Sequence, residues 1–150
     1  MYHDVLFPTD GSEGANAAIE HAIDHALTYD ATLHVLYVVE KTYPAVEAGP
    51  ADVLDALRSE GEAALDDARE RAKEAGVESV RGSVTGGSPY RNILRYADEH
   101  KIDLIVMGTH GRRGVDRYLL GSVTEKVVRT ADCPVLTVRV KERENEDVVE

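Results

Sequence analysis

The apolar and polar positions along this chain follow two different periods. Short runs rich in apolar and β-branched residues have the length and composition of strands, and they cover residues 5–7, 32–39, 77–84, 103–107 and 133–140. Between these runs, apolar residues recur three and four positions apart, which is the spacing of one helix face. The run at 32–39 is almost continuously apolar, as in a strand that is covered by helices on both faces.

Four helices fit the segments with the longer period, at residues 12–27, 52–75, 89–100 and 119–130. Ser12 or Asp10 is placed to cap the first helix, and Gly76 ends the second. Ser88 and Pro89 suit the N-cap and the first turn of the third helix. The apolar face predicted for the first helix consists of Ala15, Ala18, Ile19, Ala22, Ile23, Ala26 and Leu27.

Alternating strands and helices with strands of this kind indicate a single α/β domain. The predicted architecture is a three-layer α/β/α sandwich around a five-stranded parallel sheet. No internal repeat, low-complexity block or linker divides the sequence. We expect residues 1–141 to form the domain and residues 142–150 to form a charged C-terminal tail.

Composition narrows the class of protein. The chain has 150 residues, a formal net charge of −11 and 43% hydrophobic residues, which fits a folded domain. An acidic chain with a pI near 4.9 is a poor general ligand for nucleic acids and anionic membranes. The single cysteine, Cys133, excludes an internal disulfide, and the sequence shows neither a signal peptide nor an apolar run of membrane-spanning length. We therefore expect a soluble cytoplasmic protein.

Arginine outnumbers lysine among the basic residues, with 12 arginines and 5 lysines. An acidic surface that is poor in lysine suits a protein kept soluble in concentrated salt, so a halophilic origin is one interpretation. An ordinary acidic cytosolic protein is the other, and composition does not separate the two.

The loops that follow strands one, two and four are the places to look for a ligand, because open parallel sheets bind ligands beyond the carboxyl ends of their strands. The third of these loops is the richest, with glycines at 108, 111, 114 and 121. Glycines let the backbone approach a ligand, and free N–H groups at a helix start bind phosphate. Ser122 and Thr124 add hydroxyl groups at that helix start.

Charge supports an anion site in the same loop. Residues 108–129 contain five basic and two acidic side chains, a net charge of +3, which leaves −14 for the rest of the chain. Such a positive island would attract an anionic ligand. A solvated surface loop with ordinary arginines is the alternative, and the glycines alone do not exclude it.

The glycine spacing differs from two common nucleotide motifs. Gly-x-x-Gly-x-x-Gly after the fourth strand is not the Gly-x-Gly-x-x-Gly of dinucleotide sites, which follows the first strand. A P-loop is excluded because no glycine-lysine pair is followed by serine or threonine.

Five pieces of this sequence, in order and at matching intervals, resemble the universal stress protein family. They are the Gly-x2-Gly-x9-Gly-Ser spacing at 108–122, Pro-Thr-Asp-Gly-Ser at 8–12, Leu-Tyr-Val-Val at 36–39, Met-Gly-Thr-His-Gly at 107–111 and Cys-Pro-Val-Leu at 133–136. The first is similar to the ATP-binding pattern of that family. The resemblance covers nearly the whole chain and implies a Rossmann-like fold, similar to the adenine nucleotide alpha hydrolases, with strand order 3-2-1-4-5.

The resemblance also implies roles for individual residues. Asp10 would bind the ribose, Pro8 and Thr9 would line the adenine pocket, and the backbone of Val38 would read the adenine edge. Gly108 and Gly111 would approach ribose and phosphates. The remaining expected contacts are Gly121, Ser122, Val123 and Thr124 on the phosphates, which Mg²⁺ or Mn²⁺ would bridge, together with Met107, His110 and Arg112.

Several residues have a plainer interpretation. Asp10 is also a good helix-capping residue, and a phosphoacceptor role for it is disfavoured because no acidic pair or matching lysine accompanies it. His21 and His25 have a metal-chelating spacing but suit a solvated helix surface, and His34 suits a structural role within a strand. Cys133 suits a buried, inert thiol. We expect no catalytic residue and no protein-held metal site.

The last strand, Val135 to Val140, would be an edge strand in this order. The resemblance implies that it pairs with its copy in a homodimer. The leading hypothesis is an ATP-binding stress-response regulator or sensor. A slow ATPase or nucleotide phosphotransferase is the second, and a dimeric interaction module with an incidental nucleotide pocket is the third.

Overall fold

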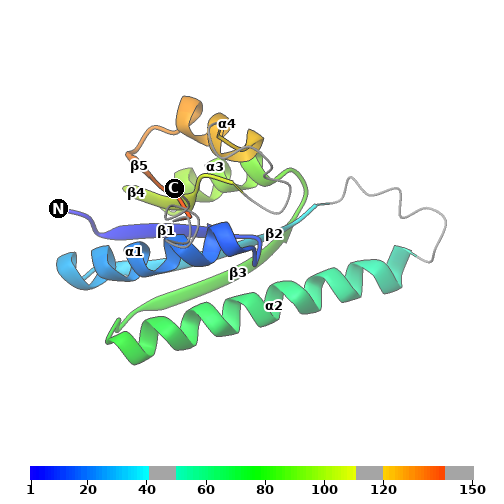
Figure 1. Cartoon of the computed structure of the whole chain (residues 1–150), viewed down its shortest axis with the longest axis horizontal. Helices are drawn as coiled ribbons and strands as arrows, with labels where there is room; N and C mark the ends of the chain where they lie inside the picture. Colours follow the sequence, from blue (N-terminus) through cyan, green and yellow to red (C-terminus); the bar gives the residue numbers. More distant parts are fainter. Residues whose placement is uncertain (41–49, 111–119, 141–150) are drawn as a thin grey trace, which may run out of the picture.

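The computed structural model describes residues 1–40, 50–110 and 120–140, apart from the side chains of residues 50–54. Strands and helices alternate along the chain (Figure 1). In order, they are β1 (Asp4–Thr9), α1 (Glu13–Tyr29), β2 (Thr32–Val39), α2 (Pro50–Ala75), β3 (Val80–Gly86), α3 (Pro89–Glu99), β4 (Leu104–Gly108), α4 (Ser122–Thr130) and β5 (Val135–Val138).

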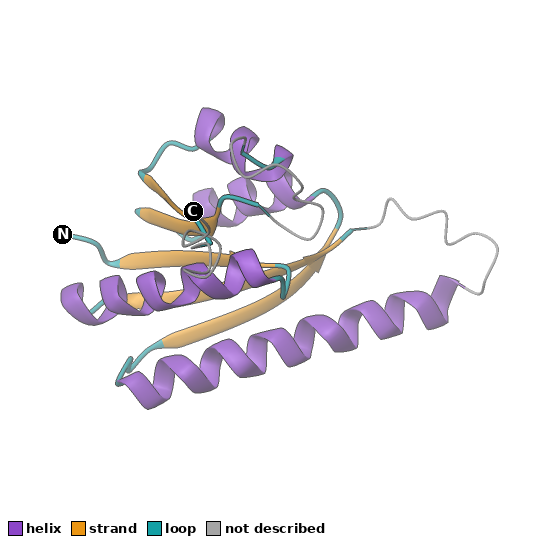
Figure 2. Ribbon diagram, viewed as in Figure 1, coloured by secondary structure: helices purple, strands orange, loops and turns teal. Residues whose placement is uncertain are grey.

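The five strands form one parallel sheet in the order β3-β2-β1-β4-β5, which confirms the predicted architecture and strand order. The central strand β1 pairs with β2 along its whole length and with β4 at Val5 and Leu6. Strand order therefore reverses at β1, where β2 leads to one edge and β4 to the other. Figure 2 shows helices on both sides of this twisted sheet.

Alternate strand residues enter two separate cores. Val5 and Phe7 of β1 face α1 and α2, whereas Leu6 between them faces α3 and α4. All three side chains are at most 1% exposed, because helices cover both faces of β1. This two-sided burial explains why the strands read as nearly continuous apolar runs.

Helix α1 shows how the local sequence sets an element. Ser12 is its N-cap, and the Ser12 hydroxyl accepts a hydrogen bond from the Ala15 N–H at 3.3 Å. The predicted apolar face is buried as far as Ala26, but Leu27 is 42% exposed. The prediction for Leu27 was wrong because the chain leaves the helix soon afterwards, through Asp30 in the left-handed region.

Other element ends also differ from the prediction. Helix α4 begins at Ser122 rather than 119, because Gly121 has extended backbone angles and its N–H donates to the Thr109 carbonyl at 2.7 Å. Strand β3 begins at Val80 because the Val77 N–H still bonds back to the end of α2. Strand β5 is shorter than predicted and ends at Val138.

No helix in the described part of the chain is both long enough and apolar enough to cross a membrane.

Candidate functional site

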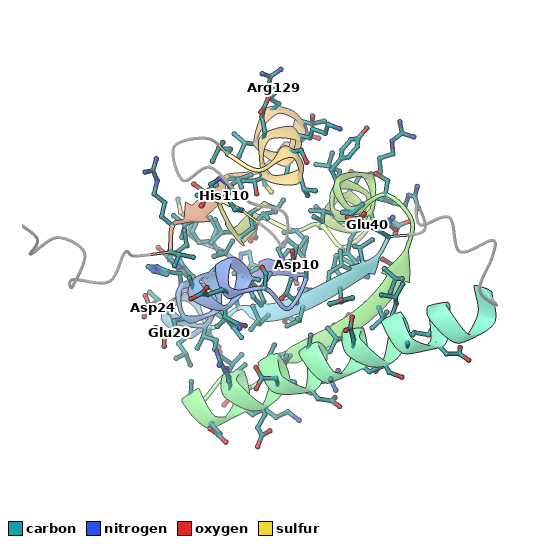
Figure 3. The ribbon with its side chains drawn as sticks, turned by 45° about the vertical axis from the view of Figure 1, so that its right-hand side comes forward. Asp10, Glu20, Asp24, Glu40, His110 and Arg129 are labelled. Carbon is teal, nitrogen blue, oxygen red and sulfur yellow. The ribbon has the colours of Figure 1, made fainter. Side chains whose placement is uncertain are left out.

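A cavity of about 280 Å³ lies at the carboxyl edge of the sheet, where β1, β2 and β4 end. All the predicted site residues that the structure describes line this cavity, whereas Gly111 and Arg112 fall outside the described residues. The β strands and their ends contribute Pro8, Thr9, Asp10, Val38, Met107, Gly108 and His110. The start of α4 contributes Gly121, Ser122, Val123 and Thr124. Figure 3 shows Asp10 and His110 on neighbouring segments at this edge.

The topology creates this hollow. The connection after β1 leads into α1 on one face of the sheet, whereas α3 and α4 lie together on the other face. The strand ends therefore diverge at β1 and leave a crevice, as expected where strand order reverses.

The turn after β1 is held by its own side chains. The Gly11 N–H donates to the Thr9 hydroxyl at 3.0 Å, and the Ser12 N–H donates to the Asp10 carboxylate at 2.9 Å. Gly11 has a φ of 76°, a left-handed conformation that glycine adopts without strain. Ser12 is the N-cap, so Asp10 supports the turn before the helix while it also lines the cavity.

The opposite wall joins the end of β4 to the start of α4. The buried Thr124 hydroxyl donates to the Gly108 carbonyl at 2.9 Å, and the Gly121 N–H donates to the Thr109 carbonyl. The Gly121 carbonyl accepts the first helical hydrogen bond, from the Glu125 N–H at 2.9 Å. The N–H groups of residues 122–124 are therefore those that a helix leaves without an intrahelical acceptor, and they lie at the cavity wall.

Two glycines bring α1 close to the end of β4. A Cβ atom on Gly108 would lie 2.6 Å from the Gly14 carbonyl oxygen, and one on Gly14 would collide with the His110 carbonyl. Glycine at 108 is therefore required by packing against α1, in addition to any need for close approach by a ligand. The contact fixes the first turn of α1 next to His110.

His110 has an incomplete set of partners. Its Nδ1 lies 3.2 Å from the Thr109 hydroxyl, whereas its buried Nε2 has no hydrogen-bond partner among the described residues. Leaving a buried polar atom unpaired costs about 1–3 kcal/mol. This ring therefore offers a hydrogen-bonding atom at the cavity wall.

Sequence reasoning missed three notable lining residues, Glu40, Pro89 and Ile93. Glu40 directly follows β2, in one of the three loops where a ligand is expected from the sequence. Its carboxylate is the second one at the cavity, beside that of Asp10 (Figure 3). Pro89 and Ile93 come from α3, which follows the edge strand β3. They reach the cavity because α3 packs beside α4, and no local sequence signal reveals that packing.

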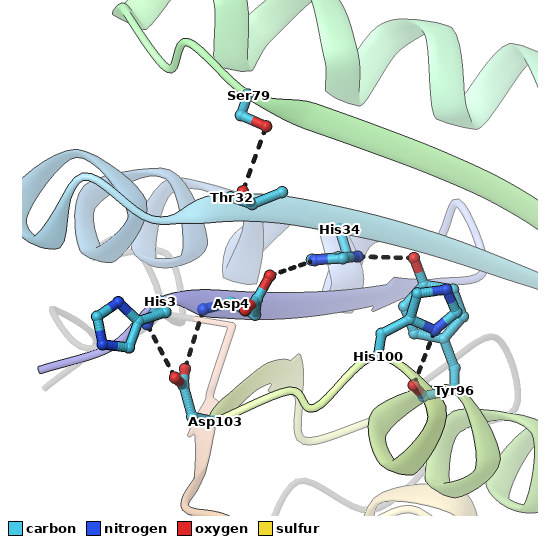
Figure 4. Close-up of polar contacts among 8 residues, drawn as sticks. All are labelled: His3, Asp4, Thr32, His34, Ser79, Tyr96, His100 and Asp103. Atoms are coloured by element: carbon cyan, nitrogen blue, oxygen red, sulfur yellow. Dashed lines mark hydrogen bonds and ion pairs between the residues drawn. The ribbon is translucent and has the colours of Figure 1, made fainter.

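The amino edge of the sheet holds a different polar cluster (Figure 4). The His34 side chain is 2% exposed, and its ring nitrogens lie 2.7 Å from the Tyr96 hydroxyl and 2.9 Å from the Asp4 carboxylate. Burial lowers the pKa of His34 below 6.5, although the bond to Asp4 opposes that shift. The His100 ring stacks on Tyr96 at 3.7 Å. His34 therefore has the predicted structural role.

The other candidates are also accounted for. His21 is exposed, and the His25 ring bonds the His21 carbonyl at 2.8 Å and stacks on Tyr29. Burial raises the pKa of the partly buried Cys133 thiol, which fits an inert group. Within the described ranges, no three histidine, cysteine or acidic side chains gather as a metal site would require.

Comparison with known proteins gives consistent matches. A profile of the universal stress protein family matches residues 1–139. A universal stress protein of Methanocaldococcus jannaschii is 39% identical over 149 residues, which cover 96% of this chain and 86% of that protein.

Two solved structures are similar across most of both chains. Universal stress protein UspA from Lactobacillus plantarum has 32% identity and a TM-score of 0.85, with 92% of this chain and 98% of that chain covered. A universal stress protein crystallised in complex with cAMP has 29% identity and a TM-score of 0.70, with 93% and 98% covered.

Proposed function

Because this chain belongs to the universal stress protein family, we propose that its cavity binds an adenine nucleotide. The proposed ligand is ATP with Mg²⁺ or Mn²⁺ on its phosphates, and the proposed role is that of a nucleotide-dependent stress-response regulator or sensor. A similar protein crystallised with cAMP supports the ligand class, since cAMP contains adenine, ribose and phosphate.

The main support for the proposal is the set of backbone N–H groups at the start of α4, which lie at the cavity wall. The first helical hydrogen bond runs from the Glu125 N–H to the Gly121 carbonyl, so the N–H groups of residues 122–124 have no intrahelical acceptor and lie at the cavity wall. A helix start also carries partial positive charge, which favours phosphate. We propose that the phosphates lie against Gly121, Ser122, Val123 and Thr124.

The adenosine part would occupy the wall formed by β1 and β2. Asp10 provides a carboxylate for the ribose hydroxyls, as acidic residues do in other nucleotide-binding sheets. Pro8 and Thr9 offer a partly apolar surface for the base, and Val38 offers backbone polar groups for its edge. Met107, Gly108 and His110 close the cavity on the side of β4. The proposal retains Gly111 and Arg112 on the strength of the sequence resemblance.

The donor set fits a cation held mainly by the nucleotide itself. The exposed Ser122 hydroxyl at the start of α4 would offer the cation one protein oxygen, and the Thr124 hydroxyl, which donates its proton to the Gly108 carbonyl, keeps its oxygen lone pairs. Mg²⁺ commonly binds in this way, through substrate phosphates, waters and few protein oxygens. When bound, the cation would neutralise phosphate charge.

We also propose a homodimer through the last strand. Among the described residues, strand β5 is the edge of the sheet, and Val135–Val138 pair with β4 on one side only. An edge with four half-buried residues is a template for pairing with its copy. Sedimentation equilibrium should give twice the 16.4 kDa chain mass, and a monomer at micromolar concentration would contradict the dimer.

The binding proposal is tested by titrating the protein with ATP, ADP, AMP and GTP, with and without Mg²⁺, while phosphate release is followed. We expect adenine nucleotides to bind more tightly than GTP, and phosphate release to stay far below the roughly 10 s⁻¹ of a typical enzyme. Efficient release would instead favour the ATPase hypothesis. No adenine nucleotide binding at millimolar concentration would overturn both.

A further inference from the structure

The two helical layers of this protein differ in charge. Helices α1 and α2 together carry eleven acidic and four basic side chains, a net charge of −7. Helices α3 and α4 carry four basic and three acidic side chains, a net charge of +1. In a chain with a net charge of −11, the α3–α4 layer is therefore the exception.

The basic side chains of this layer lie on matching faces of two neighbouring helices. Arg91 and Arg95 are four residues apart on α3, and Lys126 and Arg129 are three apart on α4, so each pair shares one helix face. All four residues are exposed. Helices α3 and α4 pack together on the same side of the sheet (Figure 1), and Arg129 extends outward from α4 (Figure 3).

Tyr90 links the cations of the two helices. The Lys126 ammonium lies 4.6 Å from the centroid of the Tyr90 ring, a cation–π distance, and the Arg91 Nε donates to the Tyr90 hydroxyl at 3.1 Å. One aromatic ring thus holds a lysine from α4 and an arginine from α3. Side chains ordered in this way lose less entropy when they bind a partner.

We propose that the face formed by Tyr90, Arg91, Arg95, Lys126 and Arg129, here called the basic face, docks an acidic segment of another protein. Charge complementarity selects this partner, because carboxylates on a short segment would meet four exposed cations, of which Arg129 also pairs with Glu125 on its own helix at 3.0 Å. A long nucleic acid carries many more negative charges than a short peptide, so the net charge of −11 of this chain would oppose it more strongly. A second copy docked on this face would bring together two chains that each carry a net charge of −11, a larger repulsion than a short acidic segment meets.

The basic face adjoins the cavity. Pro89 and Ile93 of α3 line the cavity, whereas Tyr90 and Arg91 on the same turns belong to the basic face. On α4, Ser122 and Val123 line the cavity and Lys126 follows one turn later. A partner docked here would contact the two helices that form one wall of the cavity. Docking itself does not require that the cavity binds a nucleotide.

The test uses the full chain and a fluorescent twelve-residue glutamate-rich peptide at about 50 mM salt, with anisotropy as the readout. Charge reversal on the basic face, Arg95→Glu with Lys126→Glu, should weaken peptide binding about tenfold. The matched control, Arg58→Glu with Lys73→Glu, changes the net charge equally at exposed positions of α2. It should weaken binding less than twofold.

Circular dichroism melts of both double variants report whether each still folds. If the basic-face variant does not fold, the single change Arg95→Ala should still weaken binding more than Arg58→Ala does. No binding of the peptide by the wild-type chain, or equal weakening in both double variants, would overturn the proposal. Tighter binding of a twelve-nucleotide single-stranded DNA than of the peptide would overturn it in favour of a nucleic-acid surface.

Discussion

The two edges of the sheet use the same residue types in opposite ways. At the amino edge, both ring nitrogens of His34 are paired, with the Tyr96 hydroxyl and the Asp4 carboxylate. At the carboxyl edge, His110 and Asp10 line an open cavity, and the buried His110 Nε2 has no partner among the described residues. The carboxylate of Asp10 also supports the turn before α1, by accepting from the Ser12 N–H, so the contrast between the two edges rests on the two histidines.

The comparison teaches that two histidines of one fold differ in their pairing, since both ring nitrogens of His34 have partners and the buried Nε2 of His110 has none among the described residues. A buried polar group whose partners lie inside the fold contributes to stability, and its removal leaves those partners unpaired. We expect a polar group at the cavity wall to contribute to ligand binding instead. Substitutions at the two edges should therefore separate affinity from stability.

Gly121→Val should have the largest effect, on affinity at the carboxyl edge. Gly121 has a φ of −64° and a ψ of 156°, which valine adopts readily, so the fold should persist. The added side chain would stand at the cavity wall, where the phosphates are proposed to bind. We expect ATP affinity, measured by calorimetry, to fall at least about 100-fold, or roughly 2.7 kcal/mol.

The control for Gly121→Val is its melting temperature, which should stay within a few degrees of the wild-type value. Unchanged ATP affinity in a folded variant would show that the phosphates bind elsewhere.

His34→Leu should have the next largest effect, on stability at the amino edge. Leucine leaves the Tyr96 hydroxyl and the Asp4 carboxylate without the partner they have in the native fold. We expect the free energy of unfolding, from urea titration, to fall by about 2 kcal/mol. ATP affinity should change less than twofold, and a large loss of affinity at full stability would reverse the assignment of the two edges.

Ser12→Ala should have a smaller effect and tests a side chain that serves the fold beside the cavity. The Ser12 hydroxyl caps α1 by accepting from the Ala15 N–H. Its loss should lower the free energy of unfolding by about 1 kcal/mol. We expect ATP affinity to change little, because Ser12 does not line the cavity, and a tenfold loss would place it in the site.

The smallest expected effect is a pH dependence at the amino edge. Burial lowers the pKa of His34 below its value of 6.5 in the unfolded chain, against the opposing contribution of Asp4. The unfolded chain therefore binds this proton more readily, and the stability due to neutral His34 is lost as the pH falls from 6.5 through the lower folded pKa. The stability advantage of wild type over His34→Leu should shrink between pH 7.5 and 5. An advantage that grew would contradict the assigned cause.

Much of the fold could be predicted because local pattern and burial agree. The run at 32–39 is a strand from Thr32 to Val39, since a strand buried on both faces is apolar throughout. The start of α4 could not be placed, because it depends on a hydrogen bond between Gly121 and Thr109, which are twelve residues apart. The prediction that Leu27 is buried was wrong for a similar reason, since helical spacing does not show where a helix leaves the core.

The candidate site was predictable where it consists of strand ends and glycines that are close in sequence. Asp10 and Gly108 reach one cavity because the parallel strands β1 and β4 end at the same edge, and Ser122 reaches it from the start of α4. Pro89 and Ile93 were missed because their place in the cavity depends on how α3 packs against α4. Position 108 must also be glycine because its backbone lies against Gly14 of α1, and only the three-dimensional structure shows this contact.

The central claim is that a nucleotide binds at the carboxyl edge and leaves the amino edge undisturbed. The most direct test is an NMR titration of the isotope-labelled chain with ATP and Mg²⁺. The account predicts that the largest backbone amide shifts occur at Asp10, Ser122 and Val123, with little change at His34 and Tyr96. Shifts centred on His34 and Tyr96, or no shifts at saturating ATP, would contradict it.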